Sequence, residues 1–342
     1  MSKGIFVFRL SNELFSLALS EVKAILLAEA LDTEIVNRID EFLLIRTDLS
    51  TALNVCDRAS LVIEMGSLIS IVNEDDINEI VKIIKDFMHE ENTCLSMDSV
   101  RGFGKDFITQ LLNILLHKFK QGLWRRCSRI LKVSFVSGLA VIYEVLYRRR
   151  QLKFENREPH KRPCYRPGTM KPQLARALVN LSRVSARSNH VLLDPFCGVG
   201  GIVLEACSIG ISALCSDLDS KMCICAKKNL EHFQCGDKVE VFIADGTREN
   251  FREHIVDAIV TDPPYGIQSI PMGTSLTTLI RGFLNTASNI IKSKRFAVFA
   301  VPIELEIDVN KWLTDYNFET VEKHLNMVHG SLTRVIYVVV KL

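Results

Sequence analysis

The second half of the chain alternates short apolar runs with amphipathic stretches in a regular order. The runs are rich in β-branched residues, and the stretches between them repeat apolar residues every three or four positions. This alternation is typical of a parallel sheet with helices on both faces. The predicted strands are residues 191–194, 211–216, 239–244, 257–261 and 295–301, and the predicted helices are residues 202–208, 220–233 and 276–291.

The two ends of the chain have a different pattern. After the last predicted helix, residues 319–325 and 334–341 flank Gly330 and Ser331, which predicts an antiparallel pair that closes the sheet. The first half mixes strands and helices without a regular order, as expected of an α+β fold. There we predict strands at 4–9, 41–46, 130–136 and 139–146, the last two forming a hairpin around Ser137 and Gly138, and helices at 20–29, 77–89 and 111–119.

Composition narrows the class of protein. The chain has 342 residues, 48% of them hydrophobic, so we expect a folded globular protein of two or three domains. No apolar run reaches the roughly 18 residues of a spanning helix, and no signal peptide is recognisable. We therefore expect a cytoplasmic protein without membrane contact. The ten cysteines are scattered without metal-ligand spacing, which predicts reduced thiols and no metal site.

The net charge of +2 conceals one strongly basic segment. Residues 148–176, which we call the strap, contain two acidic residues, and four prolines favour an extended backbone there. Such a cluster with interleaved aromatics suits a polyanion, although a solvated linker has the same composition. Its ten basic residues are Arg148, Arg149, Arg150, Lys153, Arg157, Lys161, Arg162, Arg166, Lys171 and Arg176.

A glycine-rich loop follows the first strand of the second half. Asp194 ends that strand, and Gly198, Gly200 and Gly201 precede a helix, so the backbone there can turn tightly and approach a ligand. The spacing is not that of a dinucleotide fingerprint. A carboxylate before the loop suits the ammonium of an amino acid better than a pyrophosphate, which favours S-adenosylmethionine over NAD.

The next two strands also end in acidic residues. Asp217 is placed to accept hydrogen bonds from the ribose hydroxyls, and Asp245, followed by Gly246, from the adenine amino group. Each acid alone could be a loop or helix-cap residue. Three acids at three successive strand ends predict a nucleoside cofactor.

The fourth strand runs into Asp262-Pro263-Pro264-Tyr265. An exocyclic amine on a base is a poor nucleophile because the ring delocalises its lone pair. The Asp262 carboxylate and the Pro263 carbonyl could each accept one of its N–H bonds and orient the nitrogen toward the methyl group. Tyr265 would stack on the base. These residues predict a methyltransferase that acts on an amino group.

Together these motifs resemble a known family. The strap segments 157–163 and 167–172, followed by 174–181, look like those of the archaeal tRNA (guanine-10-N2) methyltransferases of the Trm11 family. The resemblance implies an α/β Rossmann-like class I methyltransferase domain at the C-terminus, preceded by an α+β ferredoxin-like and THUMP region. The implied domains are an N-terminal ferredoxin-like segment (1–50), a THUMP-like RNA-binding domain (51–147), a basic linker (148–170) and the methyltransferase domain (171–342).

The resemblance also implies the reaction and the site. The expected activity is methylation of the exocyclic N2 of guanosine at position 10 of tRNA, once or twice, with S-adenosylmethionine as cofactor. A small activator subunit could be a further partner. Two alternatives stay open: an adenine-N6 methyltransferase acting on DNA or a large RNA, and a non-catalytic tRNA-binding module. The predicted catalytic residues are Asp262, Pro263 and Tyr265, and the predicted cofactor-binding residues are Thr169, Asp194, Phe196, Gly198, Gly200, Asp217, Leu218, Asp245 and Gly246.

Overall fold

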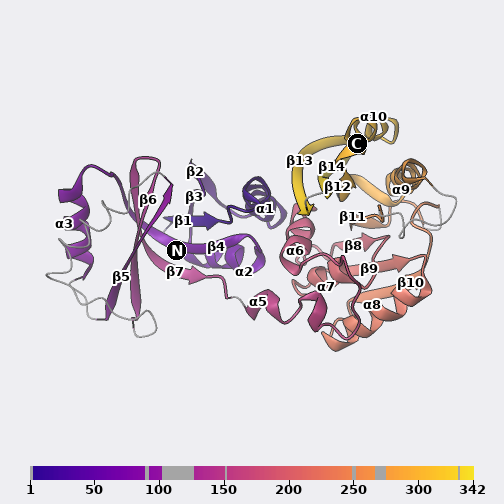
Figure 1. Ribbon diagram of the computed structural model, residues 1–342, viewed down its shortest axis with the longest axis horizontal. Coiled ribbons are helices and arrows are strands. Elements are labelled where there is room, and N and C mark those ends of the chain that lie inside the picture. Colours follow the sequence, from indigo (N-terminus) through magenta and orange to yellow (C-terminus); the bar gives the residue numbers. More distant parts are fainter. Residues whose placement is uncertain are drawn as a thin grey trace. The chain divides into compact units, whose positions relative to one another are not determined.

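The computed structural model describes residues 3–88, 92–101, 127–150, 152–248, 252–265, 275–329 and 332–342. The predicted helix at 111–119 and the turn at Gly330 and Ser331 lie outside these residues. The chain forms two compact units, and each is described by itself (Figure 1). The first comprises Met1–Phe15, Asp32–Asp57 and Val62–Arg150, and the second comprises Ser16–Leu31, Arg58–Leu61 and Gln151–Leu342.

The first unit contains one seven-stranded sheet in the order β2-β3-β1-β4-β7-β6-β5. Its strands are β1 (Gly4–Leu10), β2 (Glu34–Ile39), β3 (Phe42–Thr47), β4 (Val62–Asn73), β5 (Thr93–Arg101), β6 (Arg129–Val136) and β7 (Leu139–Arg148), with helices α2 (Leu49–Arg58) and α3 (Ile77–Met88). β6 and β7 pair antiparallel, which confirms the predicted hairpin. Ile80 and Ile84 of α3 pack on the buried side chains of these two strands.

The second unit contains another seven-stranded sheet, in the order β10-β9-β8-β11-β12-β14-β13. The strands from β10 to β12 run parallel, and β14 and β13 complete the sheet antiparallel, as predicted. This α/β sheet confirms the predicted Rossmann-like fold class. Its strands are β8 (Val191–Asp194), β9 (Ser212–Asp217), β10 (Val239–Ile243), β11 (Val256–Thr261), β12 (Ile291–Pro302), β13 (Phe318–His329) and β14 (Leu332–Lys341).

Helices cover both faces of this sheet (Figure 1). On one face lie α6 (Pro172–Leu181), α7 (Gly201–Cys207) and α8 (Ser220–His232), and on the other lie α9 (Leu276–Ile290) and α10 (Glu306–Asp315). The largest core cluster joins α9 and α10 to the central strands through residues such as Phe283, Leu313 and Tyr337. This packing follows from the near-continuous apolar composition of β11 and β12, whose side chains must be buried on both faces.

A helix from the N-terminal part of the chain belongs to this second unit. In α1 (Phe15–Ala28), the residues from Ser16 onward cluster with it, together with Arg58–Leu61. Glu21 is fully buried and accepts hydrogen bonds from Ser60 N at 2.9 Å and from Asn180 Nδ2 of α6 at 2.8 Å. This association cannot be inferred from the sequence, because the helical period of α1 does not reveal its packing partner.

The prediction of separate, reduced cysteines is wrong for eight of the ten. The structure forms the disulfides Cys94–Cys127, Cys164–Cys225, Cys197–Cys215 and Cys207–Cys235, and Cys56 and Cys223 take no part in these disulfides. Partners lie 18 to 61 residues apart in the chain and meet only in the folded sheet and its connections. Cys197, for example, follows β8, and Cys215 lies in the adjacent strand β9.

Within the described residues, no helix combines the length and the apolar composition needed to span a membrane.

Candidate active site

The strand order of the second unit reverses at its centre. The chain passes from β8 outward to β9 and β10 and then returns to β11 on the other side of β8. In open α/β sheets, ligands bind beyond the carboxyl ends of the strands at this reversal. Asp194 ends β8 and Asp262 follows β11, and these two strands pair through Leu192 with Ala258 and Leu193 with Ile259. The two halves of the predicted site therefore meet at one edge of the sheet (Figure 1).

Asp194 is a buried carboxyl group at this edge, with an exposed fraction of 1%. It accepts hydrogen bonds from the Thr261 hydroxyl at 2.6 Å and from the Phe196 backbone amide at 3.2 Å. Burial raises the pKa of Asp194 to about 7; these two bonds oppose the rise, and the nearby Asp217 and Asp262 add to it. Among the described residues, no basic side chain forms an ion pair with it, so an ammonium group would be a favourable ligand.

The glycine loop curves around the end of β8. Gly198 and Gly200 have φ values of +51° and +82°, a conformation that favours glycine. The Gly198 amide donates to Asp217 Oδ2 at 2.9 Å, which draws the loop onto the end of the next strand. The space that a Gly198 side chain would occupy is open, with no heavy atom of the described residues within 4 Å. The loop therefore leaves room for a ligand against its backbone.

The remaining predicted cofactor residues lie around this loop. Asp217 is half-buried, and burial raises its pKa. A Cβ on Gly246 would lie 2.7 Å from the Pro195 carbonyl oxygen and 3.0 Å from the Phe196 ring, so the third loop approaches the first closely. Asp245 accepts from Thr247 at 2.6 Å and 3.0 Å, and Leu218 is 54% exposed.

Thr169 is the one predicted residue that comes from the strap. Its hydroxyl donates to the Arg166 carbonyl at 2.6 Å, and its methyl group lies 3.8 Å from the position of a Cβ on Gly201. The strap therefore contacts the end of the glycine loop. The glycine loop thus lies close to the ends of the next two strands and to the strap. That these residues bind a cofactor stays a prediction.

Asp262 is held by an arginine that the sequence did not reveal. Arg334 of β14 donates to Asp262 Oδ2 and to the Tyr265 hydroxyl, both at 2.6 Å, and its Nε donates to Asn326 Oδ1 of β13 at 2.8 Å. The second carboxylate oxygen, Asp262 Oδ1, is buried and has no hydrogen-bond partner in the part of the chain that the structure describes. One oxygen is thus fixed and the other is free to accept.

The ionisation states of Asp262 and Tyr265 depend on each other and on Arg334. Burial raises the pKa of Asp262, and the adjacent Arg334 guanidinium opposes that rise by charge and by hydrogen bonding. Burial raises the pKa of Tyr265 to about 12, with a further contribution from Asp262, so its hydroxyl stays neutral. Sequence analysis missed Arg334 and Asn326 because they lie on the antiparallel pair, about 70 residues after Asp262, in no motif.

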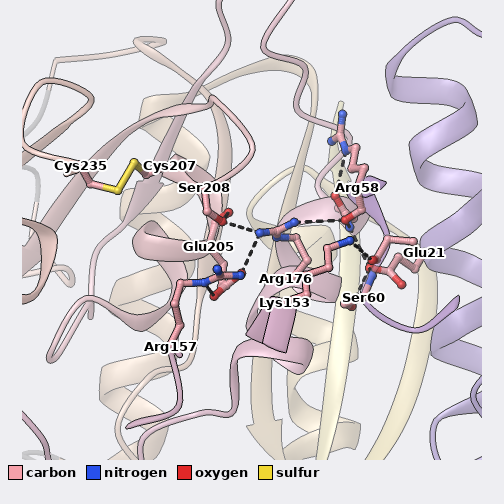
Figure 2. Close-up of polar contacts among 12 residues, drawn as sticks. Glu21, Arg58, Ser60, Lys153, Arg157, Arg176, Glu205, Cys207, Ser208 and Cys235 are labelled. Carbon is pink, nitrogen blue, oxygen red and sulfur yellow. Dashed lines mark hydrogen bonds and ion pairs between the residues drawn. A yellow bond between two sulfur atoms is a disulfide. The ribbon is translucent and has the colours of Figure 1, made fainter. Parts of the chain in front are cut away.

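The strap differs from its predicted form. It contains two short helical turns, α5 (Leu152–Glu155) and η2 (Pro159–Lys161), and its last basic residue lies in α6. Arg157 and Arg176 both pair with the buried Glu205 of α7, at 2.7 Å and 2.9 Å (Figure 2). Arg162 is also buried. The prediction of an extended backbone is therefore wrong where these helical turns and α6 form. Arg157 and Arg176 are paired with Glu205 and Arg162 is buried, so these three cations differ from a solvated linker.

Two curated proteins are similar in sequence to about half of this chain. The tRNA (guanine(10)-N2)-dimethyltransferases of Methanothermobacter thermautotrophicus and Methanocaldococcus jannaschii are 40% and 38% identical over 186 residues each. These matches cover 54% and 53% of this chain and 53% and 51% of the relatives, so the chain spans about half the length of the curated relatives it matches.

Solved structures share the fold over the full length. TrmN from Thermus thermophilus has a TM-score of 0.58 at 18% identity and covers 99% of this chain and 100% of its own. A possible methylase from Clostridium difficile has a TM-score of 0.60 at 14% identity and covers 100% and 99%.

The decisive match is to a family model. The model of UPF0020, described as an RMKL-like methyltransferase domain, matches residues 159–336, which is more than half of the chain. The chain therefore belongs to the RMKL-like methyltransferase family, and S-adenosylmethionine is the cofactor of its C-terminal domain.

Proposed function

We propose that this protein transfers a methyl group from S-adenosylmethionine to the exocyclic N2 of guanosine at position 10 of tRNA, in the cytoplasm. The observation that carries the chemistry is the state of Asp262, which has one oxygen fixed by Arg334 and the other buried and unpartnered among the described residues. The names of the relatives support the choice of nucleotide, since the two that are 40% and 38% identical are tRNA (guanine(10)-N2)-dimethyltransferases.

The residues present fit the cofactor. Asp194 offers a buried carboxylate to an ammonium group, and Gly198 leaves open space beside the loop. Asp217 and Asp245 would accept from the ribose and the adenine, with Phe196, Leu218, Gly200 and Gly246 around them. When bound, the cofactor supplies an electrophilic methyl group on a sulfonium sulfur.

The chain's own groups would prepare the acceptor nitrogen. Asp262 Oδ1 and the Pro263 carbonyl would each accept one N–H bond of the amine and so aim its lone pair at the methyl carbon. Positive charge would develop on the nitrogen during methyl transfer, and Asp262 Oδ1 would be placed to hold the proton that leaves. Tyr265, tethered to Arg334 by its hydroxyl, would hold its ring against the base.

The same arrangement supports a second round. A monomethylated amine keeps one N–H bond, and Asp262 Oδ1 could still accept it. We propose mono- and dimethylation on this basis, in line with the names of the archaeal relatives. The division into segments 1–50, 51–147, 148–170 and 171–342, with a THUMP-like RNA-binding part, is also part of the proposal, as is a small activator subunit.

A single-atom change in the substrate tests the reaction. Two tRNA transcripts that differ only at position 10, guanosine or inosine, would be incubated with labelled S-adenosylmethionine. Inosine lacks the exocyclic amine, so we expect label in the guanosine transcript only, and nucleoside analysis should show N2-methylguanosine or its dimethyl form. Equal labelling of both transcripts, or labelling of DNA but not of tRNA, would contradict the proposal. The control variant Asp262→Ala should label neither.

A further inference from the structure

Arg162 is a buried cation whose terminal nitrogens lack partners. Its exposed fraction is 5%, and both Nη atoms are buried without a hydrogen-bond partner among the residues that the structure describes. Only Nε is engaged, donating to the Arg157 carbonyl at 2.9 Å. An unpaired buried guanidinium is costly, so native proteins normally pair such a group or bind an anion to it.

The neighbouring carboxylate is already committed. Glu205 is fully buried, and it accepts two hydrogen bonds from Arg157 and one from Arg176 (Figure 2). Three arginines therefore surround one glutamate. Burial lowers the pKa of Arg162, although Glu205 and Glu158 oppose this, and an arginine remains protonated near neutral pH in any case. Arg157, Arg162 and Arg176 thus leave an excess of positive charge around Glu205. This excess favours binding of an anion from outside the chain.

The position of the guanidinium indicates which anion. Arg162 Nη1 lies 3.0 Å, and its Cζ 3.9 Å, from the position that a Cβ on Gly201 would take, next to the Thr169 methyl group. The absence of a side chain at Gly201 is what allows this approach. Arg162 thus brings the strap to the Gly201 end of the glycine loop, beside Thr169, which we predict to bind the cofactor. A buried guanidinium at this place suits a small anionic group, such as the carboxylate of the cofactor, rather than the backbone of a large polyanion.

We propose that the guanidinium of Arg162 binds the carboxylate of the methionyl end of S-adenosylmethionine. Two parallel N–H donors match the two oxygens of a carboxylate. Asp194, where the loop begins, would then bind the ammonium group of the cofactor. Arg162, beside the Gly201 end of the loop, would bind the carboxylate of the same amino-acid group. The inference rests on the cofactor half of the proposed function and does not require tRNA as the acceptor.

The test compares S-adenosylmethionine with decarboxylated S-adenosylmethionine, which lacks only the carboxylate. Binding of both to the full-length protein would be measured by calorimetry without RNA, so that failure of tRNA methylation leaves the result unaffected. The wild type should bind the decarboxylated form about 100-fold more weakly, and Arg162→Gln should bind S-adenosylmethionine about 100-fold more weakly, since a charge-assisted bond is lost in each case. Arg162→Gln should not weaken binding of the decarboxylated form further.

Two controls separate binding from stability. Arg176→Gln removes a paired arginine of the same cluster, so it should lower the melting temperature and change the affinity for both ligands by the same factor. Arg162→Lys keeps the positive charge but loses the pair of parallel N–H donors. It should weaken binding of S-adenosylmethionine about 10-fold and leave binding of the decarboxylated form unchanged. The proposal is overturned if the wild type binds both ligands equally, or if Arg162→Gln or Arg162→Lys weakens both equally or neither.

Discussion

At the scale of single residues, the site depends on side chains that control a neighbour's charge. Asp262 must be ionised to take up the proton that leaves the amine, yet burial favours its neutral form. Arg334, buried beside it, supplies the compensating charge and fixes one oxygen. The tetrapeptide that the sequence displays is therefore incomplete without a partner from β14.

This pairing predicts a shift in pH dependence. Arg334→Met removes the cation that opposes the burial effect, so the pKa of Asp262 should rise and the acidic limb of the kcat profile should move to higher pH. We expect roughly 100-fold lower kcat at neutral pH. Arg334→Lys, which keeps the charge, should restore part of the activity and most of the original profile. An equal loss at every pH, without rescue by lysine, would assign Arg334 a merely structural role.

Asp194 predicts a pH dependence of stability. Its pKa is raised to about 7 in the folded protein, against about 3.9 in an unfolded chain. Between these values the folded state binds the extra proton, so its contribution to stability falls as pH rises through this window and is lowest above pH 7.

Asp194→Asn keeps the shape and the Oδ1 acceptor but cannot ionise. Its free energy of unfolding should exceed that of the wild type at pH 8 by up to about 4 kcal/mol and converge with it near pH 4. Urea unfolding of both proteins at several pH values measures this. Parallel curves for the two proteins would show that Asp194 does not titrate in this range.

At the scale of elements, the predictable features were those with a local pattern. The strands from β8 to β12 and helices α7 to α9 were found because buried parallel strands are apolar throughout, and the helices between them keep one apolar face. β2 was missed because its residues are mostly exposed, and β4 because polar residues and Gly66 interrupt it. The strap was misjudged because its buried partner, Glu205, lies in α7 and cannot be inferred from charge spacing.

The close approach of two loops gives a prediction at this scale. Gly246→Ala would place a Cβ 2.7 Å from the Pro195 carbonyl oxygen, a backbone atom that can move only with the loop after β8. We expect a loss of about 1–3 kcal/mol in the free energy of unfolding and weaker cofactor binding. Gly236→Ala is the matched control, since a Cβ there has no described heavy atom within 4 Å and should leave both quantities unchanged. Wild-type stability in Gly246→Ala would mean that the loops separate without cost.

At the scale of the whole molecule, the order of the chain and the order of the folded units differ. Most of α1 and residues Arg58–Leu61 precede or interrupt the first unit in sequence but belong to the second. They are joined to α6 by a polar network in which Arg58 Nε donates to Asn180 Oδ1 at 2.9 Å and Asn180 donates to Glu21. The second unit therefore combines segments from the N-terminal part of the chain with residues Gln151–Leu342.

Glu21 allows this association to be tested. Its Oε1 accepts from Ser60 and Asn180, and its Oε2 accepts from the Leu61 amide at 2.8 Å, all without contact with water. Glu21→Gln keeps the first acceptor but turns an NH2 group toward the Leu61 amide, so two buried donors would face each other. We expect a loss of about 1–3 kcal/mol in the free energy of unfolding of the second unit, measured by denaturant unfolding with and without S-adenosylhomocysteine.

Lys23→Gln, an exposed change on the same helix, is the control and should have no effect. Because α1 packs with the cofactor-binding unit, S-adenosylhomocysteine should raise the unfolding midpoint of both variants. The unfolding transition that Glu21→Gln lowers should be the same transition that the ligand raises. If the ligand instead shifts a transition that Glu21→Gln leaves unchanged, α1 does not unfold together with the cofactor-binding sheet.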